Sequence, residues 1–142
     1  VCSSDLTIEG YTIGNDMSSR SIEGQNPLYL AQAKVYDRSA SLGPCLAVLP
    51  SAISTETAIK LSIYRNEEKI FEDTTSVSQI KRTFDDLVKY LFLETTFEKG
   101  VMLMTGTGII PSDDFTLQIN DRVEISIDHI GTLINTVKTK LS

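Results

Sequence analysis

Aliphatic and polar residues alternate in two short stretches of the chain, and this alternation constrains the fold more than any other feature. Residues 59–64 read IKLSIY and residues 122–128 read RVEISID. Because successive side chains of a β-strand point to opposite faces of a sheet, each stretch places three aliphatic side chains on one face. Both stretches are therefore predicted to be strands whose apolar faces cover a hydrophobic core.

Most of the remaining pattern also indicates short strands. Asn66-Glu67 is a turn signal that would join residues 59–64 to residues 69–73 in a hairpin. Further strands are expected at residues 7–14, 101–105 and 131–137. The chain from residue 23 to residue 42 is irregular and is expected to form a long loop.

Apolar residues recur at helical spacing in one stretch, residues 77–93. Ser76 and Gln79 have the form of a capping box, so the helix is predicted to begin directly after Ser76. One main amphipathic helix among about seven short strands predicts an α+β, mainly β fold with a mixed sheet.

Composition narrows the possible partners. The chain has 142 residues and a formal net charge of −6, so it offers no basic stripe for a nucleic acid backbone. An anionic substrate would need local positive charge from a metal or from a particular Arg or Lys. The two cysteines lack the spacing of metal or redox sites, and no apolar run approaches the roughly 20 residues that cross a bilayer. A cytoplasmic protein without a membrane partner is expected.

Polar residues gather where the first predicted strand ends, in the segment GYTIGNDMSSRSIEG at residues 10–24. Asp16 could be an oxygen ligand for Mg²⁺, which prefers carboxylates. Capping an Asx turn is the commoner use of an aspartate in such a loop. Arg20 could bind a substrate carboxylate through both arms of its planar guanidinium, although an arginine in a loop is more often a solvated surface residue.

Two later residues are also candidates. Lys34 lies among small and apolar residues, where partial burial and a nearby cation would ease its use in proton transfer. An ordinary surface lysine is the alternative. Thr107 offers a hydroxyl between Gly106 and Gly108, which allow the backbone to approach a ligand closely. A simple tight turn explains the same three residues equally well.

Four motifs, in order along the chain, resemble those of the fumarylacetoacetate hydrolase family. They are Y-T-x-x-N-D-x-S-x-R at residues 11–20, a lysine before Leu-Gly-Pro at residues 32–44, Thr-Gly-Thr at residues 105–107, and LQINDRVEISIDHIGTLINTV at residues 117–137. Together they cover nearly all of residues 7–138. The resemblance implies the family's roll or barrel of mixed β-sheet, and a homo-oligomer, a dimer or tetramer, for the full-length protein.

The resemblance also implies a role for each candidate residue. Asp16 would be one of three carboxylates that hold Mg²⁺, with Mn²⁺ or Ca²⁺ as alternatives. The other two, a Glu-x-Glu pair upstream of it in the family, have no counterpart in this sequence. Arg20 and Thr107 would bind substrate, and Lys34, Thr107 and Glu23 would be catalytic. Ser21 stands where the family usually has an aspartate, which puts the geometry of this loop in question.

Members of the family act on small-molecule 2-oxo acids, and the metal would stabilise an enolate. The stretch EGQNPLYLAQAKVYDRSASLGP, with MTGTGIIPSDDFTL, is most similar to the 2-keto-3-deoxy sugar-acid dehydratases. The implied reaction is the dehydration of a compound such as 2-keto-3-deoxyarabinonate to 2-oxoglutarate semialdehyde. The alternatives are a C–C bond hydrolase of the acylpyruvate or fumarylacetoacetate type, and a truncated scaffold without catalysis.

Residues 1–6 read VCSSDL, which one reading frame of a common sequencing adapter would encode. We expect these residues to be non-native and residues 7–142 to form a partial catalytic domain, truncated on its amino-terminal side. A single metal carboxylate cannot replace the water ligands of Mg²⁺. The 142 residues alone are therefore expected to bind the ion weakly and to be inactive.

Overall fold

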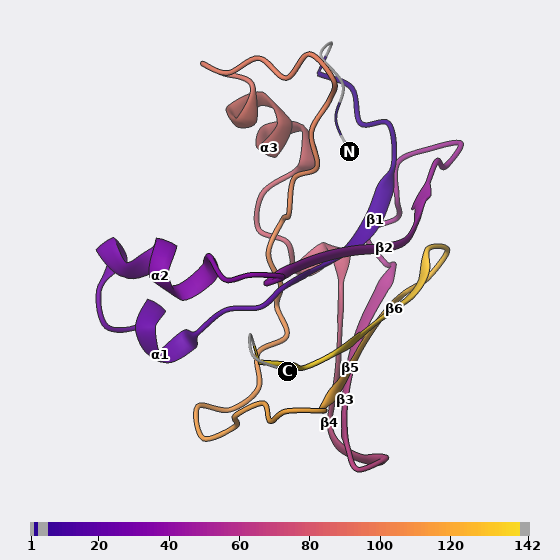
Figure 1. Cartoon of the computed structure of the whole chain (residues 1–142). Helices are drawn as coiled ribbons and strands as arrows, with labels where there is room; N and C mark the ends of the chain where they lie inside the picture. The colour runs from indigo at the N-terminus through magenta and orange to yellow at the C-terminus, as the bar shows by residue number, and fades with distance from the viewer. Residues whose placement is uncertain (1, 3–5, 140–142) are drawn as a thin grey trace.

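The computed structural model describes residue 2 and residues 6–139, and this part of the chain is mainly β, as predicted (Figure 1). Where η marks a 3-10 turn, the elements are β1 (Tyr11–Asp16), α1 (Arg20–Glu23), η1 (Pro27–Tyr29), α2 (Leu30–Lys34), β2 (Ala40–Ala47), β3 (Ala58–Arg65), β4 (Glu68–Ser76), η2 (Val77–Gln79), α3 (Phe84–Leu91), β5 (Arg122–Ile127) and β6 (Gly131–Thr136). The predicted α+β, mainly β fold class is confirmed.

The strands form two sheets. One has four strands in the order β4-β3-β5-β6, and the other is the pair β1-β2. The predicted hairpin is present, with Asn66 and Glu67 at its turn, both at positive φ. Leu61 lies opposite Ile125, so the two alternating stretches are neighbours. All these pairings are antiparallel, which differs from the expected mixed sheet. Short turns join β3 to β4 and β5 to β6, and such turns connect antiparallel neighbours.

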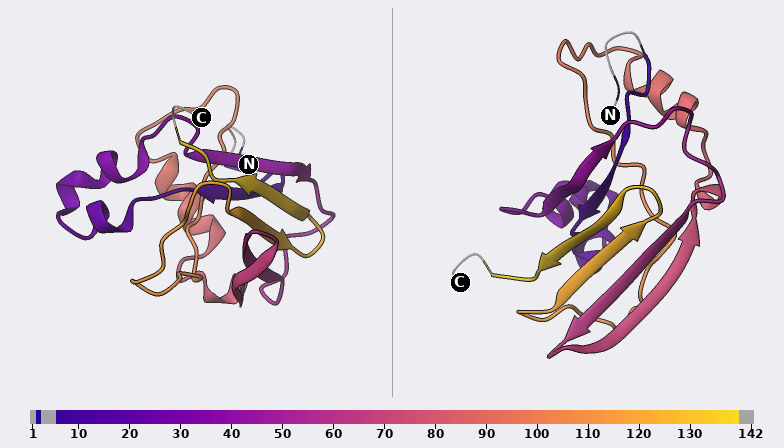
Figure 2. Two further views of the ribbon diagram at one scale, coloured as in Figure 1. Left: turned by 60° about the horizontal axis from the view of Figure 1, so that its bottom comes forward. Right: turned by 90° about the vertical axis from the view of Figure 1, so that its right-hand side faces the viewer.

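The hydrophobic core lies between the two sheets. Ile13 of β1 is 1% exposed and clusters with Ile53, Ile130 and Leu133. The right-hand view of Figure 2 shows the β1-β2 pair beside the β5-β6 side of the larger sheet. Burial of these aliphatic side chains drives the packing of one sheet on the other.

A chain of side-chain amides also joins the two sheets. The amide nitrogen of Asn15 donates to Oδ1 of Asn135 at 2.9 Å, and the amide nitrogen of Asn135 donates to Oγ of Ser41 at 2.9 Å. Asn15 is buried, so these bonds satisfy polar atoms that have little access to water. The network fixes β1 and β2 against β6.

The main helix begins later than predicted. Residues 77–79 form a 3-10 turn, Ile80 is extended, and α3 starts at Phe84. Ser76 makes no capping hydrogen bond, whereas Oγ1 of Thr83 accepts one from the amide of Asp86 at 3.1 Å. Two acidic residues in the first turn also favour a start there, because the amino end of a helix is electropositive. The predicted start after Ser76 was therefore wrong.

Two further boundaries differ from expectation. Residues 101–105 do not form a strand: among the residues that the structure describes, only Val101 of this stretch is paired, in an isolated bridge with Cys2. The expected loop at residues 23–42 contains α2 and the start of β2. Figure 1 shows α1 and α2 projecting together from the β1-β2 pair.

The first residues are only partly described. Cys2 is 4% exposed, and its amide donates to the carbonyl of Val101 at 2.9 Å. Residues 1 and 3–5 lie outside the described part, so the expectation that residues 1–6 are non-native stays a prediction. Across residues 6–139, no helix is long and apolar enough to span a bilayer.

Candidate active site

Asp16 is the last residue of β1, on the side of the strand that faces away from the core. Ile13 and Asn15 point inward and are buried, while Gly14 and Asp16 are exposed. This alternation follows from the two-residue period of a strand. The strand therefore presents the Asp16 carboxylate to solvent at its carboxyl end.

Lys34 meets Asp16 although 18 positions separate them in the chain. Its Nζ donates to Oδ2 of Asp16 at 2.9 Å and to Oγ of Ser18 at 2.7 Å. The turn after β1 and the end of α2 are held together because the amide of Ser19 donates to the carbonyl of the buried Ala33 at 2.8 Å. The structure thus brings together the carboxylate and the ammonium group that the sequence singled out.

This pair contributes little to folding. The side chains of Lys34 and Asp16 are 33% and 39% exposed. Ion pairs with such access to water are worth about 0.2–1 kcal/mol. Two opposite charges held at a strand end for so little stability are available to bind a polar ligand.

Arg20 does not join them. Its guanidinium donates to three backbone carbonyls, those of Pro111 at 2.6 Å, Ser112 at 2.9 Å and Phe115 at 3.2 Å. It also lies 3.7 Å from the exposed carboxylate of Asp113. Arg20 therefore holds the loop at residues 111–115 in place. It could bind substrate through the same nitrogen atoms only if these hydrogen bonds broke.

Thr107 lies in the exposed loop after residue 104. Its Oγ1 accepts a hydrogen bond from the amide of Ile109 at 3.0 Å, which is the tight-turn arrangement. Gly106 has φ +84, a left-handed conformation that favours glycine. The side chain of Met104 lies 3.3 Å from the position that a Cβ on Gly14 would occupy. The loop therefore lies against the same face of β1 that carries Asp16.

Glu23 ends α1 and is exposed. Its amide donates to the carbonyl of Ser19 at 3.0 Å, which closes the single turn of this helix. Within residues 6–139, no hydrogen bond or ion pair joins its carboxylate to the Asp16–Lys34 pair. The catalytic role expected of Glu23 stays a prediction.

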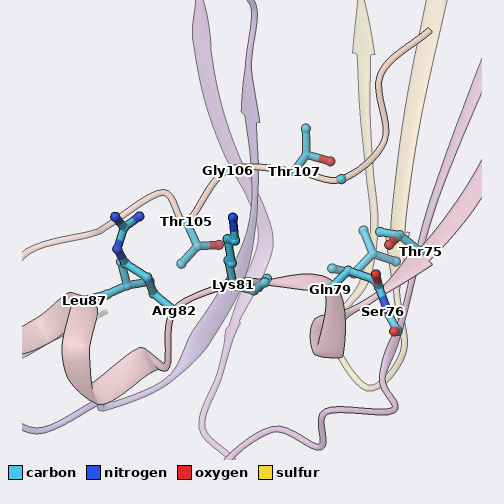
Figure 3. A pocket seen from close by; sticks show the side chains of 12 residues that line it. Thr75, Ser76, Gln79, Lys81, Arg82, Leu87, Thr105, Gly106 and Thr107 are labelled. Carbon is cyan, nitrogen blue, oxygen red and sulfur yellow. The ribbon is translucent and has the colours of Figure 1, made fainter.

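Sequence reasoning missed a cleft beside the Thr107 loop (Figure 3). It has a volume of about 270 Å³, and Thr105, Gly106, Thr107 and Gly108 form one wall. The other wall comes from the segment between β4 and α3 and includes Lys81 and Arg82. Both residues fall inside the helix predicted at residues 77–93. The signal that could have placed them in a turn is the Thr83-x-x-Asp86 spacing of a helix start.

A complete magnesium site is not formed by these residues. Within residue 2 and residues 6–139, no three His, Cys, Asp or Glu side chains are grouped so that they could hold a metal. Asp16 offers one carboxylate, and it faces the ammonium of Lys34. The donor set of the described residues therefore does not fit a resident Mg²⁺ by itself.

The fold and this site define a mainly β domain with a carboxylate and an ammonium group at the end of one strand and a hydroxyl-lined cleft beside the Thr107 loop. The chain belongs to the fumarylacetoacetate hydrolase family: residues 5–138 match the family model described as Fumarylacetoacetate (FAA) hydrolase C-terminal. This confirms the resemblance on which the sequence interpretation depended.

Two relatives and one solved structure show where in the family the similarity lies. A Haloferax volcanii protein named "Probable 2-keto-3-deoxyxylonate dehydratase" is 48% identical over 134 residues, which are 93% of this chain and 46% of the relative. The 2-dehydro-3-deoxy-D-arabinonate dehydratase of Saccharolobus solfataricus is 36% identical over 141 residues, 99% of this chain and 47% of the relative. The chain thus spans about half the length of these relatives.

The structure of 2-keto-3-deoxy-D-arabinonate dehydratase complexed with magnesium and 2,5-dioxopentanoate has the same fold. It superposes with a TM-score of 0.92 at 37% identity and covers 97% of this chain and 50% of that chain. These two relatives and this solved structure are named as sugar-acid dehydratases, in agreement with the subgroup that the sequence motifs indicated.

Proposed function

We propose that this chain is part of a magnesium-dependent dehydratase that acts on a 2-keto-3-deoxy sugar acid. The observation that carries the proposal is the Lys34 ammonium held between the Asp16 carboxylate and the Ser18 hydroxyl. The identity of 48% with the H. volcanii protein supports the choice of substrate class. The activity proposed is that of the whole protein, because the chain spans about half of such relatives.

The reaction removes one water molecule from the substrate. A proton leaves C3, and the hydroxyl at C4 accepts a proton and leaves as water, which forms a C3–C4 double bond. Loss of a proton from C5 and return of a proton to C3 then move the double bond to C4–C5, and the resulting enol becomes the aldehyde. We assign the proton transfer to Lys34, because its amine can accept a proton and its ammonium can donate one. Asp16 and Ser18 hold its Nζ in one position, and a fixed proton carrier is what general acid–base catalysis requires.

A magnesium ion, when bound, would stabilise negative charge on the oxygen of the 2-oxo group. Asp16 is the described residue suited to ligate it, and the remaining ligands would have to come from outside the described residues. Thr107 would bind a substrate oxygen with its hydroxyl. A homo-oligomeric assembly of the full-length protein and a cytoplasmic location remain predictions.

A hybrid enzyme tests the proposal. Residues 7–138 would replace the matched segment of the H. volcanii protein, and the hybrid would be incubated with Mg²⁺ and 2-keto-3-deoxyxylonate or 2-keto-3-deoxyarabinonate. We expect a semialdehyde product by NMR. Lys34→Met should lower kcat at least 100-fold, a typical share for a general acid–base residue, while Lys89→Met on α3 should not.

Two results would contradict the proposal. Cleavage of acylpyruvates without dehydration of either sugar acid would assign the C–C bond hydrolase instead. A folded hybrid that binds Mg²⁺ but turns over neither class of substrate would favour the scaffold. Circular dichroism of each variant separates these outcomes from a failure to fold.

A further inference from the structure

The β1-β2 pair has two faces, and only one of them packs on the core. Along β1, Ile13 and Asn15 point inward, so Gly14 and Asp16 point outward. Leu42 of β2 lies directly opposite Gly14 and therefore shares its outward face. Gly14, Asp16 and Leu42 are all exposed, so the outward face of the pair is open to solvent in the described part of the chain.

Large apolar side chains lie on this outward face. Leu42, Leu46 and Met104 are 44%, 45% and 37% exposed. Atoms of Leu42 and Met104 lie 3.5 Å and 3.3 Å from the position that a Cβ on Gly14 would occupy. An atom of Leu46 lies 3.0 Å from the matching position on Gly10. These three side chains lie over glycines on one side of β1, and we call them the outer apolar face.

The outer apolar face has the features of a binding surface. Leu42 and Met104 lie against the same glycine, so they are adjacent rather than scattered, and a contiguous exposed apolar surface marks a place where another part of a protein packs. Within the described residues, β1 and β2 each have a strand neighbour on one edge only. An open strand edge can pair with a further strand.

The length of the relatives favours one occupant, the rest of the same polypeptide. The matched segments are 46% and 47% of the H. volcanii and S. solfataricus relatives, so a protein of that length has as much chain again to pack against this half. A covalently joined segment is present at an effective concentration in the millimolar range. It therefore covers the face in preference to a second copy of the protein free in solution.

We propose that the outer apolar face is the docking surface for the part of the full-length polypeptide that lies outside this chain. Leu42, Leu46 and Met104 become core residues there, packed against apolar side chains of the docked segment. Asp16 points to the same side of β1, where the described carboxylates are too few to hold a metal. The docking surface rests on the exposed apolar side chains, whereas its use in completing a metal site rests on the proposed function.

Cysteine labelling tests the surface in the 142-residue chain and in the hybrid enzyme. Leu42→Cys and Leu46→Cys place thiols on the face, Lys89→Cys on α3 is the control, and peptide mass spectrometry separates them from the exposed Cys45. In the 142-residue chain all three introduced thiols should react readily with a maleimide, because all three positions are exposed. In the hybrid, positions 42 and 46 should react roughly 100-fold more slowly, because labelling would need local opening, and position 89 should not change.

A buried charge gives a second measurement. The double variant Leu42→Glu, Leu46→Glu should lower the melting temperature of the hybrid by about 10 °C or more, because docking would bury two carboxylates. The same variant should change the melting temperature of the 142-residue chain by less than about 2 °C, because both positions are exposed there. Equal effects in the two proteins would contradict the docking surface.

Two labelling results would overturn the inference. Positions 42 and 46 could react equally fast in both proteins, or their protection in the hybrid could disappear on dilution, which would assign the face to a second copy. Neither measurement depends on turnover. An inactive hybrid with both positions protected would contradict the dehydratase alone, and an active hybrid with both positions reactive would contradict the docking surface alone.

Discussion

The ion pair between Arg65 and Asp121 offers the sharpest test of what holds the sheet to the loop before β5. Asp121 is 1% exposed and accepts hydrogen bonds from Nε of Arg65 at 2.9 Å, from Nη2 of Arg65 at 2.8 Å and from the amide of Gln118 at 2.8 Å. Arg65 also donates to the carbonyl of Thr116 at 3.0 Å. One carboxylate therefore joins the end of β3 to residues 116–121.

The substitution Asp121→Asn keeps the shape of the side chain and removes its charge. Removing one partner of a buried ion pair costs about 3–5 kcal/mol. Arg65 keeps its bond to Thr116, and its side chain is 28% exposed, so water relieves part of this cost. We therefore expect the low end of that range, about 3 kcal/mol of unfolding free energy, and a melting temperature lower by about 10 °C.

Urea unfolding of the chain, followed by circular dichroism at neutral pH, measures the effect. Asp113→Asn is the matched control, because that carboxylate is fully exposed and 3.7 Å from Arg20. The control should change stability by less than about 0.5 kcal/mol. Equal stability of the two variants would refute the idea that the buried pair anchors this loop.

Other predictions concern acid stability, the helix start and the amide network. Hydrogen bonds from Lys60, Lys69 and Ser62 lower the pKa of the Glu72 carboxyl from 4.5 to about 2. A carboxyl whose pKa is lowered on folding stabilises the fold at pH values above 4.5, and this contribution should be lost as the pH falls from 4.5 to about 2. In Glu72→Gln, the unfolding free energy should therefore depend less on pH across that window. Thr83→Ala should cost about 1 kcal/mol of unfolding free energy in urea titrations, because it removes the cap of α3, whereas no loss would place the helix start elsewhere. Asn135→Leu should cost about 1–3 kcal/mol, because it leaves the buried amide of Asn15 unsatisfied, and unchanged amide exchange at Asn15 would contradict this.

The alternation of apolar and polar residues was sufficient to predict strands that pair with the next strand along the chain. The alternation at residues 59–64 and the turn at Asn66 define a hairpin that needs no distant information. Residues 101–105 had the composition of a strand, but in the described part of the chain only Val101 is paired, with Cys2, and such pairing depends on parts of the chain far apart in sequence. The helix start was missed because two capping signals compete, and the acidic first turn after Thr83 favours the later one.

The candidate site was also predictable only in part. Asp16 and Lys34 stand in motifs of the family, and the fold brings them within hydrogen-bonding distance. The guanidinium of Arg20 could not be placed from sequence, because its carbonyl partners lie more than 90 residues away. Lys81 and Arg82 were overlooked because apolar residues around them repeat at helical spacing.

The bridge from Asn15 through Asn135 to Ser41 has a consequence for altering substrate preference. It supports the strand that carries Asp16 from the interior, and none of its three side chains lines the cleft. A mutagenesis library could therefore diversify positions 81, 82 and 105 freely while the two asparagines are kept. Such a library would change ligand selectivity and leave the position of the β1 backbone unchanged.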